Sequence, residues 1–185
     1  MRRILTVLAT VMLLAVPAFA REVVLHDFET ETNLRTLAAN GAVLELFELS
    51  AENVASGESS AKLVFDLTDP DQSWSEVNLI VDFPDTVDIE GAHEVSLWVH
   101  GDGTPHVLYV LFYDGFVEGS VWTAVDWEGW RLLRLPLFEI ESRWNIEYVR
   151  MDRLQRVRVV VGDGAGTNKT KGVLWIDRLA VSVAD

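Results

Sequence analysis

The stretch GVLWIDRLAVS, from Gly172 to Ser182, is apolar along nearly its whole length, yet Asp177 and Arg178 stand in the middle of it. An apolar run of this length is typical of a β-strand buried in a hydrophobic core. An unpaired carboxylate in such a strand costs several kcal/mol, so its presence predicts a specific partner for Asp177. The identity of that partner depends on the fold that the strand completes.

Strand character continues upstream as a regular alternation of apolar and polar residues. SEVNLIVDF (75–83), EVSLWVHG (94–101) and RVRVVVG (156–162) carry apolar side chains at every second position. This period of two predicts strands with one buried face. HVLYVLFYDG (106–115) is apolar at both parities, which predicts a central strand covered on each side.

Turn-forming sequences separate these runs, among them ASGESS, DPDQ, GDGTP, DWEG and GDGAGTN. Short strands with such turns between them predict an all-β domain of about ten strands, built as an antiparallel sandwich or barrel. Helical turns are expected near Thr32–Ala38 and Glu141–Met151. The strands are predicted near residues 22–28, 42–48, 60–67, 75–83, 94–100, 106–113, 117–123, 129–135, 154–161 and 172–182.

The chain begins with the features of a secretory signal peptide. Arg2 and Arg3 precede an apolar run, and Ala18-Phe19-Ala20 forms a small-x-small cleavage site. We predict a signal peptide over residues 1–20, too short to span a bilayer as a lone helix, followed by a single domain over 21–185. A secreted or periplasmic protein without an integral membrane anchor is expected. The sequence contains no cysteine, which excludes a disulfide and a lipid anchor on an N-terminal cysteine.

The net charge is −14, and the charges are distributed unevenly along the chain. Residues 22–130 contain 22 acidic side chains and two basic ones, whereas residues 131–185 contain ten basic and seven acidic ones. Phosphate binding needs a basic surface, so nucleic acid is not an expected partner. By itself, an acidic surface predicts only solubility.

Taken in order, six motifs resemble the galactose-binding-like β-jelly roll. The layout is similar to family 11 carbohydrate-binding modules over nearly all of residues 22–184. This resemblance implies a two-sheet antiparallel jelly-roll sandwich and a non-catalytic module that binds a polysaccharide or oligosaccharide. The motifs are LHDFET (25–30), ASGESSAKLVFDL (55–67), IEGAHEVSLWVHGDG (89–103), LYVLFYDG (108–115), DWEGWRLLRLPL (126–137) and GVLWIDRLAV (172–181).

The same resemblance implies a structural calcium ion beside the first and last strands. Its ligands in this chain would be Asp27 and Glu29 of HDFET, Glu58 of GESSAK and Asp177 of WIDRL. Calcium takes six to eight oxygen ligands without rigid spacing, so a few carboxylates completed by backbone carbonyls suffice. The alternative is that Asp177 faces solvent or pairs with a neighbouring basic side chain, Arg178 or Lys171.

Seven tryptophans in 185 residues offer candidates for sugar binding. Sugar sites combine aromatic platforms with carboxylate, amide or guanidinium groups. We expect such groups on a concave sheet face, where Trp98 and strand residues such as Arg134 and Arg156 point the same way; the alternative is that the aromatic rings pack inside the protein. The candidate ligand-binding residues are Trp98, Tyr109, Tyr113, Trp122 and Arg158, with Trp74 as a loop contributor.

A second interpretation is a structural or assembly domain of the periplasm or cell surface. Sheath proteins of spirochaete periplasmic flagella are similar in having a signal peptide followed by a jelly-roll-like β domain. The acidic first two thirds of one copy and the arginines near the end of the next would then promote self-assembly. Catalysis is not expected: SSAK (59–62) leads into an alternating strand rather than a buried helix, and no acidic pair stands out as that of a glycosidase.

Overall fold

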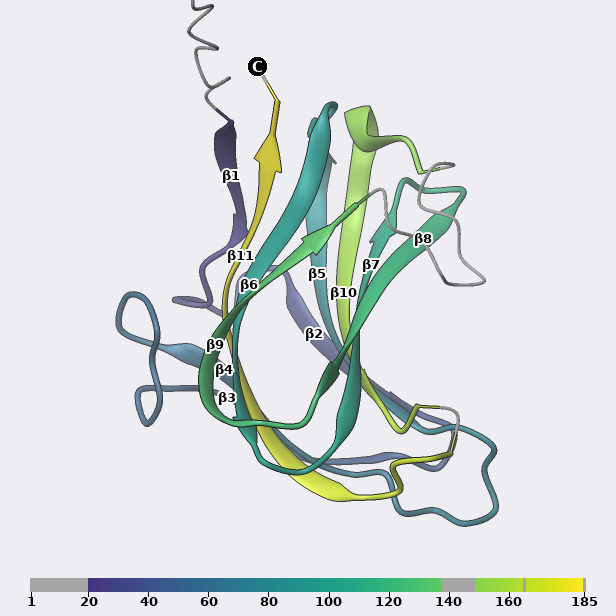
Figure 1. Ribbon diagram of the computed structural model, residues 1–185. Helices are drawn as coiled ribbons and strands as arrows, with labels where there is room; N and C mark the ends of the chain where they lie inside the picture. The colour runs from purple at the N-terminus through teal and green to yellow at the C-terminus, as the bar shows by residue number, and fades with distance from the viewer. Residues whose placement is uncertain (1–19, 138–148, 165, 185) are drawn as a thin grey trace, which may run out of the picture.

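The computed structural model describes residues 20–137, 149–164 and 166–184 (Figure 1). Within these residues the chain forms eleven β-strands and one short 3₁₀ turn. The elements are β1 Arg21–His26, β2 Leu34–Ala39, β3 Val43–Ser50, β4 Ser60–Asp66, β5 Glu76–Val87, β6 Ala92–Asp102, β7 His106–Tyr113, β8 Glu118–Val125, β9 Glu128–Pro136, η2 Met151–Arg153, β10 Leu154–Gly162 and β11 Lys171–Val183.

The strands form two antiparallel sheets, as the sequence predicts. The first sheet has the order β3-β4-β11-β6-β9, with β1 added beside β11, and the second has the order β2-β5-β10-β7-β8. The two sheets pack face to face as a sandwich, and β1 lies next to β11 at the upper left of Figure 1. The fold is therefore the expected jelly-roll sandwich.

The alternating residues of the sequence form the core between the sheets. In the middle of β5, β6 and β10, three alternate residues of each strand are at most 1% exposed, because one parity points inward there. Phe28, Phe65 and Phe112 are the bulkiest side chains that are fully buried there. The inward residues of the three strands are Val77, Leu79, Val81, Val95, Leu97, Val99, Val157, Val159 and Val161.

The long strand β11 changes its partner midway along its length. Residues Lys171–Ile176 pair with β4, whereas residues Leu179–Val183 pair with β1. Between the two halves, at Asp177 and Arg178, the register with β6 shifts, and Arg178 adopts a positive φ of 43°. Asp177 and Arg178, which interrupt the apolar run, thus mark a β-bulge where one neighbour strand ends and another begins.

Two local predictions need correction or fall outside the described residues. The helical turn expected near Thr32–Ala38 is wrong, because Leu34–Ala39 forms strand β2, paired with β5 from Leu34 opposite Val81 to Ala39 opposite Glu76. Its leucines and alanines favour a helix locally, but pairing with β5 outweighs that weak preference. Of the second expected turn, Met151–Arg153 is a 3₁₀ turn and residues 141–148 lie outside the described residues.

The predicted signal peptide lies almost wholly outside the described residues, which begin at residue 20. No helix within residues 20–137, 149–164 and 166–184 has the length and apolar character needed to cross a membrane.

Candidate functional site

The outer face of the second sheet brings most of the candidate ligand-binding residues together. Because Val77, Leu79 and Val81 point inward, the other parity of β5 and of its neighbours points away from the core. In register across the sheet, Leu37 of β2 lies opposite Asn78 of β5. The same row continues through Val160, Tyr109 and Trp122 on β10, β7 and β8. We call it the aromatic row.

The aromatic row combines exposed apolar side chains with a buried centre. Leu37 and Trp122 are 48% and 43% exposed, and Tyr109 is half-buried. The rings of Tyr109 and Trp122 lie side by side with centroids 6.5 Å apart. Adjacent strands are about 4.8 Å apart, so the row spans ~19 Å from β2 to β8. That length suits a chain of several sugar rings better than a single ring.

Charged side chains line the aromatic row on one side. Asp82 of β5 accepts hydrogen bonds from two guanidinium groups, those of Arg35 on β2 and Arg156 on β10. Burial raises the pKa of Asp82, but these two hydrogen bonds outweigh it and hold the pKa below its ordinary value. The guanidinium of Arg156 also lies over the ring of Tyr113, 5.3 Å from its centroid.

Arg158 and Glu118 form a second charged pair on this face. The Nε atom of Arg158 lies 3.5 Å from Oε1 of Glu118, and about a quarter of each side chain is exposed. Burial raises the pKa of Glu118 and outweighs the opposing effects of Arg158 and Arg156. Among the described residues, the buried Oδ1 of Asn78 has no hydrogen-bond partner, and the buried Nε of Arg158 makes the ion pair with Glu118 without hydrogen-bond geometry.

Tyr109, Tyr113, Trp122 and Arg158 thus lie on one face, but two other candidates lie elsewhere. Trp98 of β6 is on the outer face of the first sheet, in register between Asp177 and Leu132. Arg134, expected to point the same way, is also in the first sheet and pairs with Glu94.

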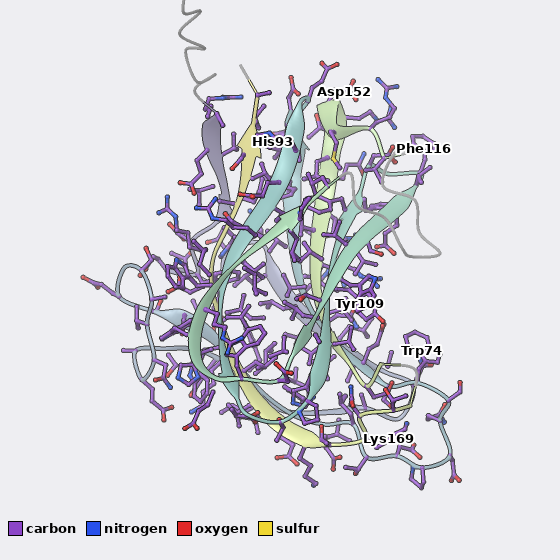
Figure 2. All side chains as sticks on the ribbon, viewed as in Figure 1. Trp74, His93, Tyr109, Phe116, Asp152 and Lys169 are labelled. Atoms are coloured by element: carbon purple, nitrogen blue, oxygen red, sulfur yellow. The ribbon has the colours of Figure 1, made fainter. Side chains whose placement is uncertain are left out.

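Trp74 lies in the loop before β5, at the same parity as the outward residues of that strand. Its indole is 46% exposed, and Figure 2 shows it on the same side of the molecule as Tyr109. Ser75, the next residue, accepts a hydrogen bond from the N–H of Asp163 just after β10, so the backbone beside Trp74 lies at the lower end of the second sheet.

Sequence reasoning missed the β2 and β5 side of this face. Leu37 and Arg35 were not identified as site residues from the sequence, because their segment was expected to be helical. In the structure, Arg35 forms an ion pair with Asp82 on this face. The alternation in SEVNLIVDF already placed Asn78 and Asp82 on a common outward parity. The sequence did not show that β5 pairs with β10.

The carboxylates expected at a calcium site partly converge. Asp177 is fully buried, and its Oδ2 accepts hydrogen bonds from the backbone N–H groups of Ala55 and Ser56, at 2.9 and 2.8 Å. Its Oδ1 is buried and has no hydrogen-bond partner among the described residues. Burial raises the pKa of Asp177, the backbone amides of Ser56, Ala55 and Arg178 lower it, and the charge of Glu29 raises it slightly further.

Glu29 is held against the same loop, since its Oε1 accepts a hydrogen bond of 2.9 Å from the N–H of Glu58. The other two candidates contribute less. The carboxylate of Asp27 is exposed and accepts a hydrogen bond from the N–H of Glu29, and the side chain of Glu58 is also exposed. No group of three or more His, Cys, Asp or Glu side chains in the described part of the chain is arranged to hold a metal.

The alternative partners of Asp177 are engaged elsewhere. Arg178 pairs with Glu22 at 2.5 Å, and Lys171 pairs with Asp66 at 2.7 Å. Asp177 neither faces solvent nor uses these cations. The carboxylate pair of Asp177 and Glu29, with a buried unpartnered oxygen between strand and loop, suits an oxygen-liganded cation whose remaining ligands come from the backbone.

Comparison with solved structures identifies the fold. A family 11 carbohydrate-binding module of a cellulosomal cellulase from Clostridium thermocellum matches with a TM-score of 0.65 and 12% identity, covering 90% of this chain and 96% of that one. A family 11 module from the same organism, in complex with a β-1,3-1,4-mixed-linked tetrasaccharide, matches with a TM-score of 0.63 and 13% identity, covering 88% and 96%. A carbohydrate-binding module with specific mannan recognition matches with a TM-score of 0.55 and 15% identity, covering 90% and 100%.

Comparison with sequences adds no relative. No protein-family model matches the chain, and no curated protein matches it significantly. At identities of 12–15%, the structural likeness shows a shared architecture. The chain has the jelly-roll fold of carbohydrate-binding modules.

Proposed function

We propose that this protein is a secreted, non-catalytic carbohydrate-binding protein that holds a polysaccharide or oligosaccharide against the outer face of the second sheet. The observation that carries the proposal is the aromatic row, in which Leu37, Tyr109 and Trp122 lie in register across the strands beside polar and charged groups. The shared fold with carbohydrate-binding modules supports it. Secretion rests on the sequence of residues 1–20.

Binding would combine stacking with hydrogen bonds. The apolar face of a sugar ring packs on an indole or phenol ring, which removes apolar surface of both from water. The hydroxyl groups at the ring edge then reach the exposed parts of Arg158 or Glu118 on the same face. Charge-assisted hydrogen bonds of this kind orient the chain and set specificity.

The charges of the face favour an uncharged glycan. Arg35 and Arg156 share Asp82, and Arg158 pairs with Glu118. An acidic saccharide would have to compete with these carboxylates and approach a chain of net charge −14. A neutral chain meets no such opposition, because its hydroxyl groups accept from the arginines and donate to the carboxylates.

We also propose that a calcium ion binds between Glu29 and Asp177. The buried Oδ1 of Asp177, which has no hydrogen-bond partner among the described residues, supports this proposal. The ion would neutralise two carboxylates brought together where β11 passes from β4 to β1. Its role would be to stabilise the loop over residues 55–59 rather than to touch the glycan.

The decisive experiment compares Trp122→Ala with Leu132→Ala. Both residues are exposed, at 43% and 37%, but Leu132 lies on the first sheet. Affinity for mixed-linkage β-1,3-1,4-glucan oligosaccharides and for soluble mannan is measured by affinity gel electrophoresis and calorimetry. We expect Trp122→Ala to weaken binding about tenfold or more, equivalent to about 1.4 kcal/mol, and Leu132→Ala to leave it unchanged.

Two results would contradict the proposal. The first is that the unmodified protein binds none of a broad panel of glycans, including these two. The second is that Trp122→Ala binds as tightly as the unmodified protein.

A further inference from the structure

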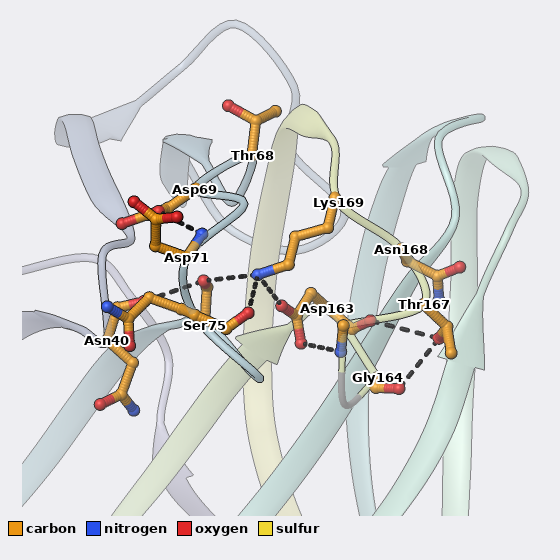
Figure 3. A network of polar contacts seen from close by, with 12 residues as sticks. Asn40, Thr68, Asp69, Asp71, Ser75, Asp163, Gly164, Thr167, Asn168 and Lys169 are labelled. Atoms are coloured by element: carbon orange, nitrogen blue, oxygen red, sulfur yellow. Dashed lines mark hydrogen bonds and ion pairs between the residues drawn. The ribbon is translucent and has the colours of Figure 1, made fainter.

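Lys169 anchors the Trp74 loop at two points, one before and one after Trp74 in the sequence. Its Nζ donates a hydrogen bond of 3.0 Å to the carbonyl oxygen of Gln72 and one of 3.3 Å to Oγ of Ser75. Gln72 and Ser75 flank Trp74 in the sequence. A single ammonium group therefore fixes the loop before and after the exposed ring (Figure 3).

The ammonium is itself held in place by Asp163. The two side chains form an ion pair of 2.9 Å, in which Asp163 is 1% exposed and Lys169 is 22% exposed. The other carboxylate oxygen, Oδ1 of Asp163, accepts a hydrogen bond of 2.9 Å from the N–H of Gly166. The contact with Oδ2 of Asp163 is an ion pair without hydrogen-bond geometry, so the carboxylate is held by charge on one oxygen and by the N–H of Gly166 on the other. Removing the cation from such a buried carboxylate is costly.

Three loops are joined at this point. The N–H of Asp163 donates to the carbonyl oxygen of Ser75 at 3.2 Å, and Oγ of Ser75 donates to the carbonyl oxygen of Asn40 at 2.9 Å. Figure 3 shows Asn40, Ser75, Asp163 and Lys169 converging in one network. The cluster ties the β2–β3 turn, the Trp74 loop and the β10–β11 loop together.

The network adjoins the aromatic row directly. On β10, Gly162 follows Val160 at the next outward position. A Cβ placed on Gly162 would lie 3.7 Å from the ring of Tyr109 and 3.6 Å from the carbonyl oxygen of Ser75. The ring of Tyr109 and the backbone of the Trp74 loop thus both lie close to Gly162.

We infer that Lys169 is a positioning residue that fixes Trp74 as an additional platform at the end of the aromatic row. The inference rests on the proposed function, because the platform matters only if a glycan lies along this face. An exposed ring on an unanchored loop loses its freedom when a ligand binds, and that loss weakens affinity. Anchoring the loop at Gln72 and Ser75 reduces this loss before the ligand arrives.

The first test needs no glycan. The protein is labelled with 5-fluorotryptophan, and the ¹⁹F resonance of Trp74 is assigned by its disappearance in Trp74→Phe. In Lys169→Met we expect this resonance to narrow and shift toward that of free fluorotryptophan, while the other assigned resonances stay in place. The control is Lys171→Met, which removes an exposed lysine that contacts Asp66 and Glu45 instead of the loop.

A second variant guards against loss of the fold. Lys169→Met leaves the buried carboxylate of Asp163 without its cation, which destabilises the protein. The double variant Asp163→Asn/Lys169→Met removes both charges and retains a side chain that accepts from Gly166. It should show the same release of Trp74. Lys169→Arg, which keeps a cation near Asp163, should restore part of the original resonance position.

The second test measures affinity in a double-mutant cycle. With the mixed-linkage tetrasaccharide or soluble mannan as probe, Trp74→Ala and Lys169→Met should each weaken binding about three- to tenfold. Trp74→Ala/Lys169→Met should be no weaker than either alone, because both remove the same platform.

The outcomes separate this inference from the proposed function. If the Trp74 resonance is unchanged in both lysine-lacking variants, or if the two effects on affinity multiply, Lys169 does not position Trp74. If the unmodified protein binds no glycan while Trp74 is released as expected, the proposed function fails and the positioning of Trp74 by Lys169 stands.

Discussion

Asp177 is a buried carboxylate in a strand that the sequence marks as core. Its Oδ2 accepts from two amides of the loop over residues 55–59, and its Oδ1 has no hydrogen-bond partner within the described residues. Glu29 is held by the N–H of Glu58, so both carboxylates contact the loop over residues 55–59. The calcium proposal therefore depends on the buried oxygen of Asp177 and on the proximity of both acidic residues to this loop.

Calcium should stabilise the protein through Asp177. A ligand that binds only the folded state adds stability of RT ln(1 + [L]/Kd), about 2.7 kcal/mol at a hundredfold excess over Kd. We expect a chelator to lower the melting temperature of the unmodified protein in calorimetry and to leave that of Asp177→Asn unchanged. Asp66→Asn is the control, because Asp66 pairs with Lys171 and is not among the expected calcium ligands. This variant should keep the response to calcium. A chelator with no effect on the unmodified protein would exclude the ion.

His106 should make stability depend on pH. Its ring is 1% exposed and contacts the hydroxyls of Thr104 at 2.6 Å and Thr170 at 3.3 Å. Burial lowers the pKa of His106 below 6.5, although the nearby Asp102 raises it. The unfolded chain therefore binds this proton more readily, so stability is full above about pH 6.5 and falls as the pH drops below that value.

The measurement is urea unfolding between about pH 7.5 and 5.5. The free energy of unfolding should decrease toward the acid end, and His106→Asn should flatten that decrease even if its absolute stability is lower. His93→Gln, at an exposed histidine, should leave the slope unaltered. If the free energy of unfolding depends on pH equally in the unmodified protein and in His106→Asn, His106 is not the cause of that dependence.

Strand β11 organises the first sheet because it changes neighbours halfway along. Its first half pairs with β4 and its second half with β1, and the bulge at Asp177 and Arg178 accommodates the change. Arg178 adopts φ of 43° there, and its guanidinium pairs with Glu22 of β1. A left-handed conformation costs about 1–2 kcal/mol for a residue with a Cβ, and more for a β-branched one.

Substitutions at Arg178 should reveal this backbone requirement. We expect Arg178→Val to lower the free energy of unfolding by about 2 kcal/mol, because a β-branched side chain opposes the positive φ. Arg178→Gly should cost much less, since relief of the backbone strain offsets an exposed ion pair that contributes about 0–1 kcal/mol. Equal losses in urea unfolding would mean that the ion pair, and not the backbone, matters at this position.

At the level of the entire protein, most of the basic charge is paired within the chain. Arg134, Arg150, Arg156 and Arg158 each contact a carboxylate of this chain, namely Glu94, Asp152, Asp82 and Glu118. Of the five arginines that suggested assembly, Arg150, Arg156 and Arg158 are thus paired within the chain, Arg153 donates to the carbonyl oxygen of Asp114, and Arg143 lies outside the described residues. Self-assembly stays a prediction, but three of its basic groups already have partners in the same copy.

Light scattering should consequently give the same molar mass at low and high salt. The comparison is between about 0.02 M and about 0.5 M NaCl, below and above the range in which surface charges are screened. A mass that is larger at low salt and falls on addition of salt would support the assembly interpretation.

The strands and their buried faces could be predicted from the sequence because alternation with a period of two records which side chains meet water. Val77, Leu79 and Val81, and likewise Val157, Val159 and Val161, all lie in the core as their parity indicates. Strand β2 could not be predicted in the same way, because LRTLAA has helix-favouring residues and weak alternation. Its conformation comes from pairing with β5, a partner about forty residues away in the chain.

The alternation in RVRVVVG also determined that Arg156 and Arg158 point away from the core, whereas HVLYVLFYDG, apolar at both parities, left the direction of Tyr109 and Tyr113 open. Only the tertiary structure decided which outward-pointing side chains of different strands lie on the same surface. It puts β10 between β5 and β7, which joins Asn78, Arg158 and Tyr109 on one face, and it puts Trp98 on the other sheet. The reason is that a strand's side-chain alternation is local, whereas its neighbours are chosen by contacts between segments far apart in the chain.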